Sequence, residues 1–139
     1  MRGVAAAFCA ALLCQAPSTA GAGTEAFLAL QGSAPDSFNY VRLSEIQAFR
    51  DSGPDRCDVL MKIGPEIKAF QSCASLTAHL DRNGLVALPG PYGSVLLLPG
   101  FVTSLVSLAS GGCRVNLLNG VWAPVTAACR EALQAIAGE

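Results

Sequence analysis

Charged side chains are scarce in this chain of 139 residues, where Asp, Glu, Lys and Arg together make up 14% and hydrophobic residues make up 52%. This composition excludes intrinsic disorder over the whole chain, because disordered segments have few apolar and many charged residues. Basic residues are not in excess either, since nine Lys and Arg stand against ten Asp and Glu. Nucleic-acid binders usually carry a basic surface, so this balance predicts that the chain binds no nucleic acid.

Catalytic motifs are also lacking. The chain has one histidine, His79, and it has no phosphate-binding glycine loop, no C-x-x-C pair and no G-x-S-x-G elbow. These absences remove the usual sequence signals of nucleotide binding, dithiol redox chemistry, two-histidine zinc sites and serine hydrolysis. We expect His79 on a helix surface, and we expect Asp51, Asp55 and Asp58 in a solvated turn, because they span too few residues for a calcium loop. The sequence therefore predicts no enzyme, no cofactor and no metal.

The N-terminal residues have the pattern of a secretory signal peptide. Arg2 supplies a short positive region, residues 4–13 form an apolar run, and small residues at 18–22 suit cleavage. The apolar run is only about half of the ~20 residues that a helix needs to cross a bilayer. We therefore expect a signal peptide over 1–22, a mature domain over 23–139, and a periplasmic or secreted location.

Four of the six cysteines would remain in the mature domain: Cys57, Cys73, Cys113 and Cys129. An even number of cysteines in a small exported domain favours disulfides. Both successive pairs are sixteen residues apart, and both segments carry Val two places and Gly seven places after the first cysteine. This similarity indicates a duplicated strand–turn–helix unit and favours the pairs Cys57–Cys73 and Cys113–Cys129 among three possible connectivities.

Hydrophobic spacing and turn residues predict the remaining elements. Apolar residues three and four apart predict helices over 65–82 and 124–137, and a capping-box pattern at 44–47 predicts a short helix over 45–51. Two apolar runs ended by Pro-Gly, 85–90 and 95–100, predict a hairpin. Other expected segments are an edge strand or ordered arm in 23–34, a strand or helix start at 38–43, a strand at 57–63, a strand or short buried helix at 101–109, and a strand from 113. The expected fold is a small single α+β domain with a mainly antiparallel sheet, two principal helices and two disulfides.

No charged residue lies between Arg82 and Arg114. Three interpretations are open: a buried sheet, membrane insertion through 94–109, or a surface covered by a partner. Pro99 and Gly100 interrupt the apolar stretch, so it could not satisfy its own backbone groups in lipid. A buried sheet is therefore favoured, because continuous apolar strands are usually covered on both faces. We also expect a protein partner or a second copy of the chain to bind the charge-poor C-terminal half.

Two aromatic residues are candidates for partner binding. Tyr92 lies at the tip of the expected hairpin, and Trp122 is the only tryptophan. Exposed loop aromatics often anchor partners, although Trp122 could instead cap the core. The leading functional hypothesis is an exported, non-catalytic protein-interaction domain, such as an accessory subunit, an inhibitor or an immunity-type protein.

One short motif favours a different function. Residues 110–114, SGGCR, resemble the Ser-x-Gly-Cys signature around the nucleophile of L,D-transpeptidases, which cross-link peptidoglycan. The resemblance implies a cell-envelope enzyme with Cys113 as its nucleophile. That family carries its catalytic histidine in a His-Gly pair closer upstream, whereas His79 lies 34 residues before Cys113 and is followed by Leu80. A membrane-associated structural protein, anchored through 94–109, is the third hypothesis.

Overall fold

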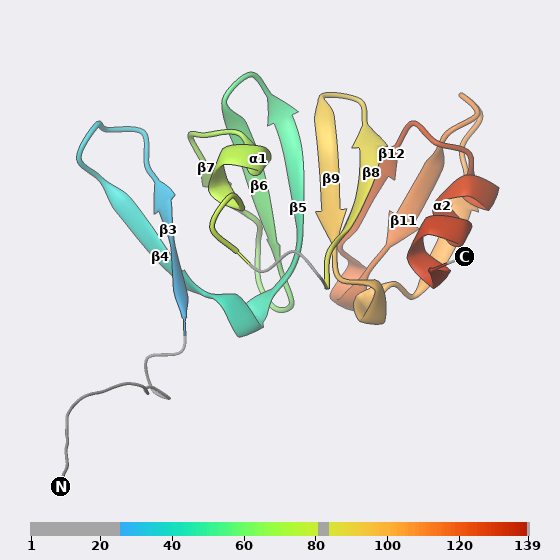
Figure 1. Ribbon diagram of the computed structural model, residues 1–139, viewed down its shortest axis with the longest axis horizontal. Helices are drawn as coiled ribbons and strands as arrows, with labels where there is room; N and C mark the ends of the chain where they lie inside the picture. Colours follow the sequence, from blue (N-terminus) through green and yellow to red (C-terminus); the bar gives the residue numbers. More distant parts are fainter. Residues whose placement is uncertain (1–25, 81–83, 139) are drawn as a thin grey trace, which may run out of the picture. The chain divides into compact units, whose positions relative to one another are not determined.

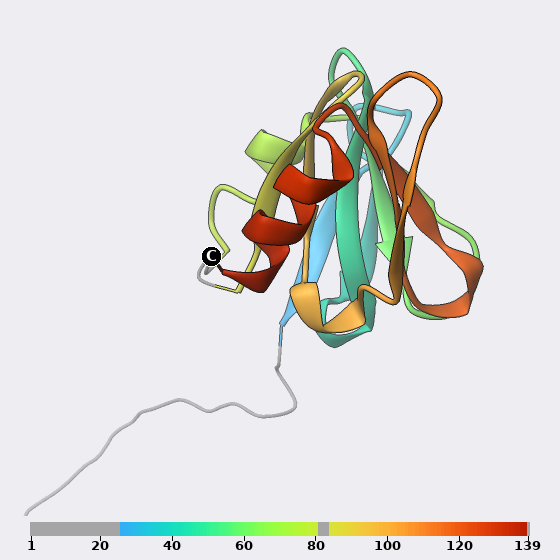
Figure 2. The same cartoon turned by 90° about the vertical axis from the view of Figure 1, so that its right-hand side faces the viewer.

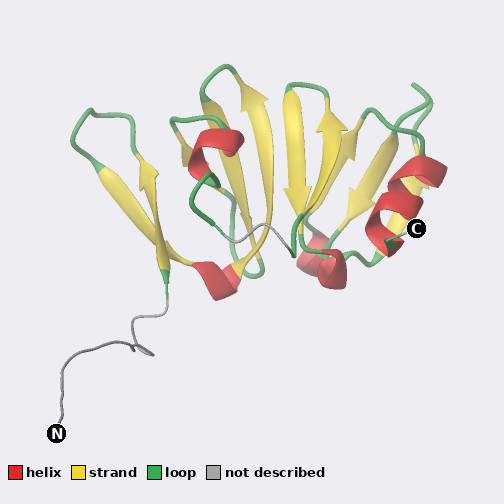
Figure 3. Cartoon of the chain, in the orientation of Figure 1, coloured by secondary structure: helices red, strands yellow, loops and turns green. Residues whose placement is uncertain are grey.

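Antiparallel strands dominate the computed structural model, which describes residues 26–80 and 84–138 (Figures 1 and 3). The two helices, α1 (Cys73–Leu76) and α2 (Cys129–Ala137), are short. The predicted fold class is confirmed: a small α+β domain with mainly antiparallel sheet, two helices and two disulfides. The predicted signal peptide over 1–22 lies outside the described residues.

The largest sheet has five strands in the order β7-β6-β5-β9-β8. Their bounds are β5 (Ile46–Gly53), β6 (Arg56–Met61), β7 (Ile67–Ala69), β8 (Val86–Gly90) and β9 (Gly93–Leu97). All pairings are antiparallel, and β5 pairs with both β6 and β9. On one face the buried side chains of Phe49, Val59 and Leu96 lie on β5, β6 and β9, the strands that α1 contacts. The predicted hairpin over 85–100 is thus confirmed as β8 and β9.

A second sheet has the order β10-β11-β12. Its strands are β10 (Ser104–Ser107), β11 (Cys113–Asn116) and β12 (Trp122–Val125), and the 3-10 turns η3 (Pro99–Phe101) and η4 (Leu118–Gly120) precede β10 and β12. The side chains alternate along β11, where Cys113 and Val115 are buried while Arg114 and Asn116 are partly exposed. This sheet therefore has one apolar face and one polar face.

The apolar face of the second sheet and one face of the first share a hydrophobic core. The buried members of this core are Ala48, Leu60, Leu88, Val95, Leu97, Cys113, Val115, Leu117, Ala123, Val125 and Ala132. Helix α2 contributes Ala132 to the core and packs against β8, β10 and β11 (Figure 2). The uncharged stretch after position 82 is explained by this core, because its apolar strands are covered from within the chain. Among the described residues, no helix combines the length and the apolar character that crossing a membrane requires.

Two segments of the chain repeat one local architecture. In each, a strand pairs with the next strand and a helix follows: β6, β7 and α1 in the first, β11, β12 and α2 in the second. Cys57 lies opposite Ala69 and is bonded to Cys73, the first residue of α1. In the second segment Cys113 lies opposite Val125 and is bonded to Cys129, the first residue of α2. The predicted local disulfides are present, and the duplicated unit contains one strand more than the sequence indicated.

The predicted helix over 65–82 is wrong. Its first part is β7, α1 is the only helical turn within its described part, 65–80, and His79 lies in an exposed turn after α1 rather than on a helix. The predicted helix over 45–51 is also wrong, because these residues belong mainly to β5. Ser44 lies in the 3-10 turn η2 (Leu43–Glu45), and the Gln47 side chain does not reach back to form a capping box. It bonds instead to the backbone of Met61 and Leu118, so long-range pairing overrides the local pattern.

The remaining alternatives resolve as strands. The segments at 23–34, 38–43 and 101–109 contain β3 (Phe27–Gln31), β4 (Phe38–Arg42) and β10 respectively. The start of the predicted helix over 124–137 belongs to β12, and α2 begins at Cys129. Gly138 ends α2 in the left-handed conformation, with φ of 80°, as glycine after a helix commonly does.

Strands β3 and β4 form a two-stranded sheet, and residues 26–29 and 40–44 cluster as a compact unit separate from 30–39 and 45–138. The Ser37 hydroxyl donates to the carbonyl of Ala34 in the turn between the strands. The Arg42 guanidinium lies 4.6 Å from the centre of the Phe27 ring. The candidate site described below belongs to the larger unit.

Candidate functional site

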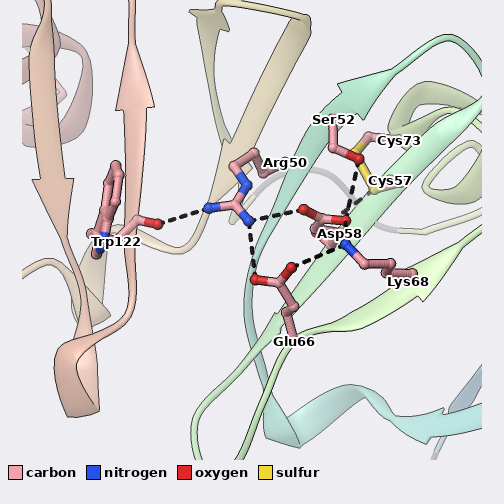
Figure 4. Close-up of polar contacts among 8 residues, drawn as sticks. All are labelled: Arg50, Ser52, Cys57, Asp58, Glu66, Lys68, Cys73 and Trp122. Atoms are coloured by element: carbon pink, nitrogen blue, oxygen red, sulfur yellow. Dashed lines mark hydrogen bonds and ion pairs between the residues drawn. A yellow bond between two sulfur atoms is a disulfide. The ribbon is translucent and has the colours of Figure 1, made fainter.

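A row of charged side chains crosses three neighbouring strands. Arg50 on β5 lies opposite Asp58 on β6, which in turn lies opposite Lys68 on β7. Arg50 Nη2 is 2.8 Å from Asp58 Oδ2 and 3.1 Å from Glu66 Oε1. Lys68 Nζ is 3.5 Å from Asp58 Oδ1 and 3.3 Å from Glu66 Oε2. Two cations and two carboxylates therefore form one closed network (Figure 4).

Asp58 is the buried centre of this network, with only 3% of the residue exposed. Burial alone would raise its pKa. The hydrogen bond and charge of Arg50, the charge of Lys68 and the hydroxyl of Ser52 outweigh burial, so the pKa of Asp58 lies below its usual value. Asp58 is consequently ionised at neutral pH. The pKa of Lys68 is raised by its hydrogen bond to Glu66 and by the charges of Asp58 and Glu66.

Arg50 also connects the two sheets. Its Nη1 donates to the carbonyl oxygen of Trp122 over 3.1 Å, and Trp122 lies on β12, the edge strand of the second sheet (Figure 4). The guanidinium is thus held by two carboxylates and one carbonyl in a fixed position. Such a fork of donors suits Arg rather than Lys, because a single ammonium could not face all three acceptors with this planar geometry.

The polar face of the second sheet carries a stacked arginine and tryptophan. Trp122 lies opposite Asn116, and both side chains lie on the face that Arg114 also occupies. The Arg114 guanidinium is 4.4 Å from the centre of the Trp122 ring, within the range of a cation–π contact. Arg114 Nε donates to Asn116 Oδ1 over 2.9 Å, which fixes the guanidinium over the ring. Trp122 remains 41% exposed, so part of its surface is open to a ligand.

Tyr92 lies at the tip of the β8–β9 hairpin, in the two-residue connection between the paired residues Gly90 and Gly93. Its exposed fraction is 67%. The carboxylate of Asp51 holds this tip, because it accepts hydrogen bonds from the backbone amides of Ser94 and Cys73 over 2.8 and 2.9 Å. Gly93 adopts φ of 142°, and a Cβ at this position would collide with the Asp51 carboxylate. Only glycine therefore permits this close approach.

Tyr92 and Trp122 line the same pocket, which has a volume of about 200 Å³. Pro91 and Pro124 add apolar wall, and Arg50, Asp51 and Asp58 also line the pocket. A neighbouring pocket of about 360 Å³ shares Arg50 and Trp122 with the first and extends to Glu66. We call the residues Arg50, Tyr92, Arg114 and Trp122 the aromatic–arginine surface.

The sequence singled out Tyr92 and Trp122 separately, and the structure brings them to one pocket. Their role in binding stays a prediction. The alternative in which Trp122 caps the core is wrong, because the ring lies on the polar face of its sheet. Sequence reasoning missed Arg50 and Arg114, whose importance depends on cross-strand neighbours, and it placed Asp58 in a solvated turn although Asp58 is buried. Arg114 could have been found from the alternation of apolar and polar residues along β11, which places Arg114 and Asn116 on one face of the sheet.

Cys113 is fully buried and bonded to Cys129. The hypothesis of a cell-envelope enzyme with a Cys113 nucleophile is therefore wrong, because a thiolate must be free to attack a substrate. The sulfurs of Cys57 and Cys73 lie within 4.8 Å of a carboxylate oxygen of Asp51. Both sulfurs belong to a disulfide, so they are not the thiolates that bind metal ions.

The sequence matches no protein-family model and no curated protein. The fold is similar to that of a solved structure. The structure resembles the LytTr DNA-binding domain of a methyl-accepting/DNA response regulator from Bacillus cereus, with a TM-score of 0.56 and 12% sequence identity. The match covers 81% of this chain and 97% of that domain. At this identity the likeness concerns the fold.

This likeness contradicts two expectations from the sequence. The leading hypothesis, an exported, non-catalytic protein-interaction domain, is wrong in its protein-interaction role, since the fold matches that of a DNA-binding domain; the expected location stays a prediction. The predicted partners are wrong for the same reason. From the sequence alone, nucleic acid was excluded and a protein or a second copy of the chain was expected to bind the charge-poor half. The exclusion relied on net charge, which does not report where the cations lie. The charge-poor half, in turn, supplies much of the core.

Proposed function

We propose that this chain is a nucleic-acid-binding domain that binds its ligand through the aromatic–arginine surface. The observation that carries the proposal is the grouping of two exposed aromatic rings, Tyr92 and Trp122, around one pocket with Arg114 stacked on the indole. Aromatic rings that stack on bases and arginines that add cation–π and phosphate contacts are the usual elements of such surfaces. The proposed activity is binding without catalysis.

The fold supports the same conclusion independently of the side chains. The solved domain that this chain resembles is described as DNA-binding, and nearly all of its length is matched. Sequence identity is 12%, so contact residues cannot be transferred from one protein to the other. The aromatic–arginine surface is therefore assigned from the geometry of this chain alone.

The low net charge is compatible with such binding because the acidic groups at the site are already paired. Asp58 and Glu66 are neutralised by Arg50 and Lys68, and Asp51 accepts two backbone hydrogen bonds. Arg114 makes no ion pair among those between described residues, and its contacts are with Asn116 and the indole. Its charge is therefore available to a phosphate. A surface with few free cations predicts modest affinity and a shallow dependence on salt.

We also propose that the chain acts in an oxidising compartment, in the periplasm or outside the cell. Its two disulfides support this location, because such bonds are rare in reducing cytosol. The signal-like pattern over 1–22 supports it as well. Expression of the full chain in bacteria, followed by fractionation and intact-mass measurement, tests this part. Cytoplasmic protein that retains residues 1–22 would contradict it.

Binding is tested by fluorescence anisotropy with labelled 20-nucleotide DNA, single-stranded and duplex, at 50 and 200 mM salt. We expect saturable binding that weakens as salt rises. Arg114→Gln should weaken binding about 5- to 10-fold, because it removes the cation that the proposal assigns to a phosphate contact. The matched control is Arg130→Gln, an exposed arginine on α2 that is outside the aromatic–arginine surface.

Two results would overturn the proposal. One is the absence of binding to either DNA at 50 mM salt by the oxidised protein. The other is an equal loss of affinity in Arg114→Gln and Arg130→Gln, which would indicate charge-driven association without a defined surface. Circular dichroism of each variant checks that the fold is retained.

A further inference from the structure

The pocket between Tyr92 and Trp122 has features that distinguish one form of nucleic acid from another. Its volume is about 200 Å³, and its walls include the exposed Tyr92 ring and the indole of Trp122. The rings of Pro91 and Pro124 complete the apolar part of the wall. Such a wall accommodates a flat, largely apolar group that can stack on the aromatic rings, and a nucleobase is a group of this kind.

The charged groups that line the pocket are already paired with one another or hydrogen-bonded to the backbone. Asp51 and Asp58 both line the pocket, and their carboxylates are held by fixed hydrogen bonds. Asp58 is ionised at neutral pH, because its pKa is lowered by Arg50, Lys68 and Ser52 against the opposing effect of burial. Arg50 also lines the pocket, but its guanidinium is already ion-paired with Asp58 and Glu66, so the pocket attracts an uncharged base rather than a phosphate. The polynucleotide backbone is therefore left to the outer, Arg114 side of the indole.

The pocket is preorganised for a base. Asp51 ties β5 to both α1 and the β8–β9 hairpin through the amides of Cys73 and Ser94. The Cys57–Cys73 disulfide closes the same region. Arg50 holds the backbone of Trp122 from the opposite side. Both aromatic rings are thus carried by segments that hydrogen bonds and a disulfide fix in place, which lowers the entropy lost on binding.

We infer that the ligand is a single-stranded polynucleotide, one unpaired base of which enters the pocket between Tyr92 and Trp122. This inference rests on the proposed function. In a duplex the base faces are stacked on one another and cannot reach either ring, whereas an unpaired base presents both faces. The small number of free cations points the same way, because base stacking supplies affinity that charge would otherwise have to provide.

The experiment uses the fluorescence of Trp122, which is the only tryptophan of the chain. The oxidised protein is titrated with a 12-nucleotide single strand of mixed sequence, with the blunt duplex of the same sequence, and with a 12-unit abasic strand. We expect the single strand to quench the fluorescence and to bind at least about 10-fold more tightly than the duplex or the abasic strand, as the loss of a base stack implies.

Tyr92→Ala should weaken single-strand binding about 10-fold, because one side of the stack is removed. The chain offers a matched control, since its two tyrosines, Tyr40 and Tyr92, are both 67% exposed and Tyr40 does not line the pocket. Tyr40→Ala should bind like the unmodified protein. Pro91→Ala, a second pocket change that leaves both rings, should weaken binding by less than Tyr92→Ala.

The possible outcomes separate the two proposals. Equal affinity for the duplex and the single strand, or for the abasic and the intact strand, would overturn the inference and leave the proposed function standing. Binding to the single strand that Tyr92→Ala and Tyr40→Ala weaken equally would also overturn it. Absence of binding to all three probes would remove the proposed function itself.

Discussion

Replacing Arg50 with Met tests the electrostatic description of the site, because Asp58 is the most deeply buried carboxylate that Arg50 neutralises. Removing one partner of a buried ion pair typically costs about 3–5 kcal/mol. Two features reduce the cost here: Lys68 Nζ remains 3.5 Å from Asp58, and the Arg50 side chain is 19% exposed. We therefore expect Arg50→Met to lower the free energy of unfolding by about 2–3 kcal/mol at pH 7.

The loss should depend on pH with a defined sign. In the unmodified protein the pKa of Asp58 is lower in the folded than in the unfolded state, so Asp58 contributes stability above about pH 4 that is lost as pH falls through the folded-state value. Without Arg50, burial still raises the pKa of Asp58, and the hydrogen bond and charge that lower it most are gone, while Lys68 and Ser52 remain. The difference between Arg50→Met and the unmodified protein should thus be smaller at pH 3 than at pH 7, because the unpaired Asp58 of the variant is protonated as pH falls.

Urea unfolding of the oxidised protein, followed by circular dichroism at pH 7 and pH 3, measures both differences. Adding Asp58→Asn to Arg50→Met should recover about half of the loss at pH 7, because the unpaired buried charge is removed. Arg130→Met is the control and should have no measurable effect. The same loss at both pH values, or no recovery in the double variant, would refute the reasoning.

Three further changes have expected effects on the free energy of unfolding. Replacing Cys113 and Cys129 together with Ala should lower the free energy of unfolding by about 3 kcal/mol, since the bond closes a loop with a separation of 16 residues. A loss of less than about 1 kcal/mol in urea unfolding would contradict this. Gln47→Leu should cost about 2 kcal/mol in the same assay, because it removes three hydrogen bonds of a buried side chain to partly buried backbone groups of Met61 and Leu118. Gly112→Ala should lower the free energy of unfolding by about 1–3 kcal/mol, because a Cβ there would collide with a carbonyl oxygen of β12. Gly100→Ala is the control and should leave thermal unfolding unchanged, because the space around its Cβ is open.

The correct parts of the sequence-based prediction came from patterns that are local in the chain. The equal spacing of the two cysteine pairs indicated the disulfides, and the Pro-Gly ends of two apolar runs indicated the β8–β9 hairpin. In both cases the interacting residues are close in sequence, and turn residues mark where the chain reverses. The burial of the uncharged stretch was also predicted correctly, because continuous apolar strands are usually covered on both faces.

The incorrect parts involved residues whose environment is set by distant strands. Gln47 fits a capping box, yet its side chain bonds to Leu118, 71 positions away. Asp58 fits a solvated turn, yet it is buried between Arg50 and Lys68 on neighbouring strands. For this reason the sequence identified only two of the four residues of the aromatic–arginine surface. Its aromatic residues are unusual in the sequence, whereas the contacts of its arginines depend on the register of neighbouring strands.

The sequential arrangement of the two disulfides has a consequence for the way the chain can be oxidised. The loop from Cys57 to Cys73 ends before the loop from Cys113 to Cys129 begins, so neither bond threads or encloses the other. Each bond can therefore form as soon as its own hairpin and helix are present, in either order and without an isomerase that must undo a crossed pairing. Oxidative refolding should accordingly pass through two single-bridged species that are both productive, and scrambled isomers should contribute little to the kinetics.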